Sequence, residues 1–199
     1  MKAQGRLAVL VTALTGSALA SAGALDAQDS PIKAELPVLL TSCGQSPGPE
    51  RVKFFLKRLE MDYEFVEQAS AQHLQSGSYK SIIIVTGASL KGMGAAGVSI
   101  QDELERTTEL IAAAQQQGVT IIGAHVEGMA RRAQGAAAGD NSDELSIDAV
   151  IPNSDLIIVR QDGNADRRFS IISENAGIPL ILFEKNMELG DVLKSVFNK

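Results

Sequence analysis

The sequence is poor in cysteine, in aromatic side chains and in clusters of basic residues. It has one cysteine, no tryptophan, 4% aromatic residues, and 18 Lys and Arg against 24 Asp and Glu, which gives a net charge of −6. The lone Cys43 cannot form an intramolecular disulfide, and the two histidines, His73 and His125, lie too far apart in sequence to form a metal motif. Because no basic block is present, binding to nucleic acid is not expected.

The first 27 residues have the composition of a cleaved secretory signal. Lys2 and Arg6 form a basic start, and Leu7–Ala20 is an apolar stretch too short to be a convincing membrane span. We therefore predict a signal peptide at residues 1–27 and a flexible segment at residues 28–35. The mature protein is expected to be periplasmic or secreted, with no stable membrane span after cleavage. An uncleaved anchor is the alternative.

Residues 36–199 are predicted to form a single α/β domain. Apolar β-branched runs alternate with stretches of helical periodicity. The expected strands are Val38–Thr41, Tyr63–Val66, Ser81–Thr86, Val119–Ala124, Leu156–Arg160 and Pro179–Phe183. Strands joined by helical crossovers form a mostly parallel sheet that is covered on both faces. The pattern thus predicts a doubly wound, three-layer α/β/α architecture with six strands.

The order of the strands follows from their composition. Ile82–Val85 is the longest β-branched run and is expected at the centre of the sheet, whereas Tyr63–Val66 carries a charge and is expected at an edge. The order 2-1-3-4-5-6 satisfies both conditions. The alternative order, 3-2-1-4-5-6, would place the isoleucine run on an edge.

Several helix ends carry local signals. Ser99 followed by Asp102 predicts a capping box, and Gly118 is expected to end that helix. Asn164 is a candidate N-cap and Gly177 a candidate C-terminal glycine for the next-to-last helix.

The candidate site lies where the strand order reverses, between the first and third strands. Ligands of open α/β sheets bind outside the carboxyl ends of the strands at such a switch point. The loops that would line it are Thr41–Ser46 and Thr86–Gly97, with backbone N–H groups of residues 44–46 and 92–97 as donors. The candidate ligand-binding residues are Ser42, Gly44, Gln45, Ser46, Thr86, Gly87, Ser89, Lys91, Gly92, Gly94, His125, Glu127, Arg131 and Arg132.

Three functions are compatible with this site. The first is a binding module for a small polar or anionic molecule, with charge supplied by Lys91 and by Arg131 or Arg132. The second is an enzyme that uses His125 as a base, with Ser42, Ser46 or Cys43 as the nucleophile. The third is an interaction domain, for which a homodimer or an exported protein is the expected partner. His125 in a structural, hydrogen-bonding role is the alternative to catalysis.

The first loop, Thr-Ser-Cys-Gly-Gln-Ser at residues 41–46, resembles the phosphate-binding loop of flavodoxin-like proteins. That resemblance implies a flavin phosphate at this position. Pro47 and Pro49, however, remove two backbone donors from the following helix, and Glu50 adds a negative charge there. The strand-end loops also offer no aromatic residues to enclose a flavin. No cofactor and no metal are therefore expected.

Nearly the whole mature chain resembles a family of small exported bacterial α/β proteins of uncharacterised function, with flavodoxin-like or Rossmann-like architecture. Pro37–Ser46, Thr86–Gly97, Glu103–Arg106 and Glu127–Arg132 carry the resemblance. It implies a shared fold and shared strand-end loops. It implies no particular activity.

Overall fold

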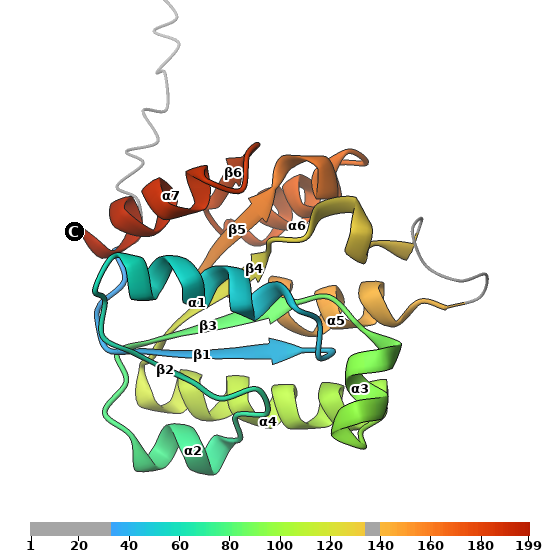
Figure 1. Ribbon diagram of the computed structural model, residues 1–199, viewed down its shortest axis with the longest axis horizontal. Coiled ribbons are helices and arrows are strands. Elements are labelled where there is room, and N and C mark those ends of the chain that lie inside the picture. Colours follow the sequence, from blue (N-terminus) through green and yellow to red (C-terminus); the bar gives the residue numbers. More distant parts are fainter. Residues whose placement is uncertain (1–32, 134–139) are drawn as a thin grey trace, which may run out of the picture. The chain divides into compact units, whose positions relative to one another are not determined.

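The computed structural model of the protein describes residues 33–133 and 140–199 (Figure 1). The predicted signal peptide at residues 1–27 and most of the predicted flexible segment lie outside the described residues. All described residues fall in one compact unit, Pro31–Lys199. Within residues 33–133 and 140–199, no helix is long and apolar enough to cross a membrane.

Parallel strands form a sheet in the order β2-β1-β3-β4-β5-β6. The strands are β1 (Val38–Cys43), β2 (Tyr63–Phe65), β3 (Ser81–Thr86), β4 (Thr120–His125), β5 (Leu156–Arg160) and β6 (Leu180–Phe183). The predicted order is confirmed. The alternative order is wrong, because β3 pairs with β1 on one side and with β4 on the other. The sheet therefore has the flavodoxin-like topology, whose switch point lies between β1 and β3.

Strand burial explains this order. Every residue of β3 is buried, as expected for a central strand, while β2 lies at the edge and exposes Glu64. β1 runs two residues further than its sequence pattern predicts, because Ser42 and Cys43 pair with Val85 and Thr86 of β3. The polar end of β1 is thus strand rather than loop.

Helices cover both faces of the sheet (Figure 1). α1 (Gly48–Arg58) and α7 (Glu188–Phe197) pack against each other on one face. α2 (Ala71–Ser76), α4 (Ile100–Gln117), α5 (Ser142–Val150) and α6 (Arg168–Ala176) cover the other face. α3 (Leu90–Ala96) follows β3 directly at the carboxyl end of the strands. The described residues thus form the predicted three-layer architecture.

Alternate residues of each central strand point to opposite cores. Leu40 and Ile83 belong to the core beneath α1 and α7, whereas Leu39, Ile82 and Ile84 belong to the core beneath α2 and α4. Because both faces are covered, the central strands are apolar without polar alternation.

Most predicted helix ends are confirmed. Ser99 and Asp102 form the capping box of α4, and Gly118 ends it in the left-handed conformation with φ 67°. Gly177 ends α6 in the same way. α6 begins later than predicted, at Arg168, but the Asn164 side chain still accepts the N–H groups of Phe169 and Ser170 at 2.9 and 3.3 Å.

The glycine-rich segment Thr86–Gly97 is mostly helix and not the loop that its composition predicts. The Ser89 side chain accepts the N–H of Gly92 at 3.1 Å and starts α3, and Gly97 ends it with φ 71°. Gly92 and Gly94 therefore lie inside a short helix. Caps at both ends stabilise a sequence whose glycines otherwise disfavour helix.

Candidate functional site

The loops after β1 and β3 touch each other directly. Gly44 has φ 103° and Gln45 has φ 56°, and Gln45 forms an isolated antiparallel bridge with Ala88. The N–H of Ser89 donates to the Gly44 carbonyl at 2.7 Å. A Cβ on Gly44 would lie 2.7 Å from Ala88 Cα and from the Gly87 carbonyl oxygen, so only glycine fits this contact. The two predicted walls of the site thus form one continuous surface.

A buried carboxylate from α4 fastens the β1 loop. Glu103 is 1% exposed, and its Oε2 accepts hydrogen bonds from the Gly44 N–H at 2.8 Å and from Gln45 Nε2 at 2.9 Å. Arg106, one turn further along, pairs with the same oxygen at 2.9 Å and donates to the Ser42 carbonyl at 2.6 Å and the Ala69 carbonyl at 2.7 Å. The loop amide of Gly44, which an anion would need, is therefore already bonded to a carboxylate of the protein.

Side chains from α5 fasten the β3 loop in a similar manner. The N–H of Gly87 donates to Ser146 Oγ at 3.0 Å, and the N–H of Ala88 donates to Asp143 Oδ1 at 2.6 Å. Burial raises the pKa of Asp143, while the Ala88 hydrogen bond opposes that shift. The N–H groups of Gly44, Gly87 and Gly92 thus all donate to side chains of the protein. Of the residues expected to offer backbone N–H groups to an anion, Gly44 and Gly92 therefore do not have theirs free.

A cavity of about 350 Å³ with a mixed polar and apolar lining opens beside these loops at the carboxyl end of β1, and its hydroxyl, amide and charged groups give it the name polar cavity. It brings together six of the predicted site residues from the two loops: Ser42, Gln45, Ser46, Ser89, Lys91 and Gly92. Pro47, Pro49, Glu50, Phe65, Glu67 and Ala95 complete its lining. Gly44, Thr86, Gly87, Gly94, His125, Glu127, Arg131 and Arg132 are not part of this lining.

His125, at the end of β4, is fully enclosed. Its Nε2 lies 3.0 Å from the Gly128 carbonyl, to which it donates, and its Nδ1 lies 3.1 Å from the Thr86 hydroxyl. Its ring packs on Phe169, with ring centroids 5.0 Å apart. Burial lowers the pKa of His125 to about 4, so the ring is neutral. These contacts fit a structural, hydrogen-bonding role for His125, which the sequence analysis gave as the alternative to catalysis.

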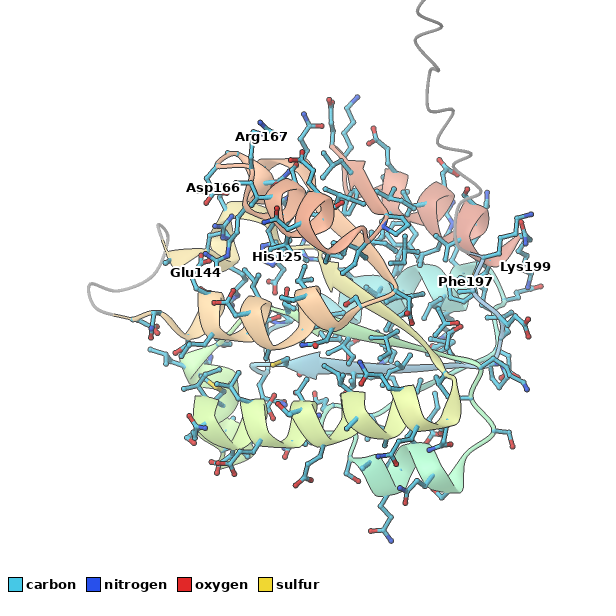
Figure 2. The ribbon with its side chains drawn as sticks, turned by 180° about the vertical axis from the view of Figure 1, so that it is seen from behind. His125, Glu144, Asp166, Arg167, Phe197 and Lys199 are labelled. Atoms are coloured by element: carbon cyan, nitrogen blue, oxygen red, sulfur yellow. The ribbon has the colours of Figure 1, made fainter. Side chains whose placement is uncertain are left out.

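The two arginines after β4 make internal contacts instead of facing the cavity. Arg131 donates to the Ala88 carbonyl at 2.8 Å and lies 3.6 Å from Glu127. Arg132 is buried and pairs with Glu144 at 2.8 Å and Asp166 at 2.6 Å. Figure 2 shows Glu144 and Asp166 at the same end of the molecule as His125. The two guanidinium groups that were expected to bind an anion thus bind carbonyl and carboxylate groups of the protein itself.

Glu127 is the least satisfied charged residue of this region. It is 4% exposed, and among the described residues its Oε2 has no hydrogen-bond partner. A Cβ on Gly48 would lie 3.1 Å from this oxygen, which places the carboxylate beside the first turn of α1. A negative charge there interacts favourably with the positive end of the helix dipole.

The candidate nucleophiles differ in their surroundings. Cys43 is fully buried, and burial raises the pKa of its thiol to about 11, so it is not a thiolate at neutral pH. Ser42 donates to the Glu67 carbonyl at 3.4 Å. Ser46 accepts the Gly48 N–H at 3.2 Å. The enclosed His125 ring bonds Thr86 and the Gly128 carbonyl, and not either of these serines.

One sequence pattern beside the cavity was not predicted as a functional motif. Residues 44–48 read Gly-Gln-Ser-Pro-Gly, which has the letters of the Gly-x-Ser-x-Gly nucleophile turn and lies between a strand and a helix. Here the positive φ angles fall on Gly44 and Gln45 and not on Ser46. The chain therefore has the letters of this motif without its strained serine.

The side chains that support the two loops were not predicted from the sequence either. Glu103 and Arg106 carry part of the family resemblance, but nothing in their spacing indicates that Glu103 holds Gly44 and Gln45, 59 and 58 residues away. Nor does it indicate that Arg106 binds the Ser42 carbonyl. Asp143 and Ser146 gave no signal either. In the part of the chain that the structure describes, no cluster of His, Cys, Asp and Glu could hold a metal ion.

A second, apolar cavity of about 380 Å³ lies between the first turns of α1 and α7. Phe54, Phe55, Val126, Phe183, Met187 and Leu189 line it together with Glu50, Arg51 and Asn186. Phe54 and Met187 are more than half exposed. Glu50 borders both cavities, so the first turn of α1 separates a polar hollow from an apolar one.

Residues 35–197 match the family described as a domain of unknown function, DUF6305. The chain belongs to this family. No functionally curated protein matches the DUF6305 chain.

Solved structures overlap the DUF6305 fold in part. A GDP-L-fucose synthetase from Naegleria fowleri bound to NADP is 12% identical with a TM-score of 0.38, covering 78% of this chain and 51% of its own. The DUF6305 chain thus spans about half the length of that enzyme. A flavodoxin from the domain Archaea is 9% identical with a TM-score of 0.37, covering 82% of this chain and 97% of its own. The esterase EstA from Pseudoalteromonas sp. is 9% identical with a TM-score of 0.34, covering 81% of this chain and 94% of its own.

Proposed function

We propose that this DUF6305 domain is a binding module for a small polar or anionic molecule held in the polar cavity. One observation carries the proposal. Hydrogen-bonding side chains from the β1 loop and from the start of α3 converge on one hollow at the switch point of the sheet. The volume, about 350 Å³, lies in the range of small-molecule sites.

Lys91 is the charged residue of the cavity lining that can bind an acidic group of a ligand. Lys91 lines the cavity and, in the described part of the chain, forms no ion pair, so its ammonium group is available to a ligand. The other lining charges are Glu50 and Glu67, and Glu50 is paired with Lys53 at 3.0 Å. A carboxylate or phosphate of the ligand would therefore lie beside Lys91.

A panel of small carboxylates, phosphates and nucleotides tests the proposal. We expect at least one compound to raise the melting temperature of the protein saturably, and Lys91→Ala to weaken that effect. Lys57→Ala, a change of another exposed lysine near the far end of α1, serves as the matched control and should bind like the wild type. A panel without any saturable stabilisation would contradict the binding module.

The second candidate function is a serine hydrolase, which only the Gly-x-Ser-x-Gly pattern favours. The enclosed His125 argues against it, since its imidazole is not free to activate Ser46. Labelling with a fluorophosphonate probe distinguishes the two functions. We expect no labelling, whereas labelling that is lost in Ser46→Ala would support the hydrolase.

We also propose that the protein acts outside the cytoplasm. The basic start and apolar stretch of residues 1–27 support this proposal. Cell fractionation with N-terminal sequencing should find a mature form that begins near residue 28. A full-length cytoplasmic form alone would contradict it.

A further inference from the structure

The Gln45 side chain has an orientation that its neighbours dictate. Its Nε2 lies 2.9 Å from Glu103 Oε2 and 3.5 Å from the Glu67 carbonyl oxygen. The other groups around Glu103 are donors, namely the Gly44 N–H and the Arg106 guanidinium, so Glu103 is a carboxylate that only accepts. Because both neighbours of the Gln45 amide are acceptors, its NH₂ group must face them. The Gln45 carbonyl oxygen is then the atom presented to the cavity.

Besides the Gln45 oxygen, the acceptors Glu50 and Glu67 line the cavity, and its donors come from Ser46, Ser89 and Lys91. Ser46 and Ser89 each accept a backbone N–H, from Gly48 at 3.2 Å and from Gly92 at 3.1 Å. Among the described residues neither hydroxyl donates a hydrogen bond, so both protons are available to a ligand. The Lys91 ammonium adds further donors. Gln45, Glu50 and Glu67 thus present acceptors from the side of β1, β2 and α1, whereas Ser89 and Lys91 present donors from the α3 side.

This polarity determines what the cavity can recognise. We infer that it selects small acids that also carry an N–H or O–H donor, such as hydroxy acids and amino acids, over simple carboxylates of the same size. The acid group lies near Ser89 and Lys91, and the donor bonds to the Gln45 carbonyl oxygen. The inference rests on the proposed function, because it names the class of ligand for the same cavity.

Glu103 is the positioning residue of this selectivity. It does not line the cavity, but it fixes which end of the Gln45 amide does. In Glu103→Gln the new amide can both donate and accept. The Gln45 side chain can then turn over, and its NH₂ group can face the ligand. Once the Gln45 amide has turned over, the preference for donor-bearing acids should disappear.

Matched pairs of acids test the inference by isothermal titration calorimetry. The pairs are malate with succinate, citrate with tricarballylate, and glutamate with glutarate, whose members differ by a single hydroxyl or amino group. In the wild type we expect the donor-bearing member of a bound pair to bind about tenfold more tightly, because the other leaves the Gln45 oxygen without a partner. In Glu103→Gln this ratio should fall towards one. Glu105→Gln, the same change at an exposed position of α4, should keep it.

A second measurement does not depend on binding. In the wild type, the Gln45 side-chain NH₂ signals in ¹⁵N NMR spectra should be protected from solvent exchange, and they should lose that protection in Glu103→Gln. Unprotected Gln45 signals in the wild type overturn the inference. So does equal binding of both members of every bound pair, in which case the binding module itself stands. If neither these acids nor the wider panel binds, the proposed function fails first.

Discussion

At the scale of single residues, the left-handed backbone of Gly44 determines how closely the two loops approach. Its φ of 103° and its tight contact with Gly87 and Ala88 leave no space for a side chain. Gly94, in contrast, has room for a side chain, because an added Cβ would meet nothing within 4 Å.

These two glycines give the first prediction. Gly44→Ala should lower the free energy of unfolding by about 2 kcal/mol or more, because it combines backbone strain with a clash against backbone atoms. Gly94→Ala, inside α3, should instead raise it by about 0.5–1 kcal/mol, because alanine loses less backbone entropy in a helix. Urea unfolding followed by circular dichroism measures both values. Equal effects of the two substitutions would contradict this account of the loop contact.

At the scale of elements, Arg132 joins three separate segments of the described chain. It follows the last turn after β4 and pairs with Glu144 on α5 and with Asp166 just before α6, and it also donates to the Gly163 carbonyl. Its side chain is 5% exposed, so solvent screens these interactions little. The ends of β4 and β5 are thereby held next to α5.

The second prediction concerns this junction. Arg132→Ala leaves the carboxylates of Glu144 and Asp166 without their main partner and should cost about 3–5 kcal/mol of stability. The matched control is Arg167→Ala, because Arg167 pairs with Glu174 at 2.9 Å with both side chains more than 60% exposed. That change should cost less than about 0.5 kcal/mol. Thermal unfolding of both variants distinguishes the buried junction from the surface pair.

At the scale of the whole molecule, the neutral His125 links folding to pH. The folded protein holds the pKa of this imidazole at about 4, whereas its ordinary value is 6.5. Between these two pH values the unfolded chain binds a proton that the folded protein does not. The contribution of His125 to stability is therefore fully present above pH 6.5 and is lost as the pH falls towards 4.

The third prediction follows from that sign. The free energy of unfolding should fall by about 2–4 kcal/mol from this residue alone as the pH drops through this window. His125→Gln should be less stable at neutral pH, but it should show a shallower pH dependence between those limits. His73→Gln, a change of the exposed histidine on α2, should keep the dependence of the wild type. Parallel pH profiles for wild type and His125→Gln would contradict the prediction.

The whole fold was more predictable than the site because its signals are periodic. The run Ile82–Val85 and the charged edge strand at Tyr63 were enough for the strand order, since burial on two faces leaves a direct mark on composition. The position of the cavity at the switch point followed from that order. The sequence could not predict that Glu103 holds Gln45, because this pairing depends on how α4 crosses beneath β1.

His125 and the glycines of α3 show where composition is ambiguous. A histidine at the end of an apolar strand suits a strand-end catalytic residue and an enclosed hydrogen-bonding residue equally well. Its enclosure depends on Phe169 and on the Gly128 carbonyl, which the folded chain brings to it. Gly92 and Gly94 favour a loop by their local conformational preference, but the N-cap formed by Ser89 stabilises a helix there.

The two ends of the described chain lie side by side, where the N–H of Ala34 donates to the Val196 carbonyl at 3.0 Å (Figure 1). This contact is at the amino-terminal edge of the sheet, whereas the polar cavity opens at the carboxyl-terminal edge. A tag, a surface linker or a fused domain joined at either end would therefore leave the mouth of the cavity facing solution. Protein immobilised through either end should then bind ligands as freely as dissolved protein does. A circular permutant that joins these neighbouring ends by a short linker would place the new connection far from the cavity.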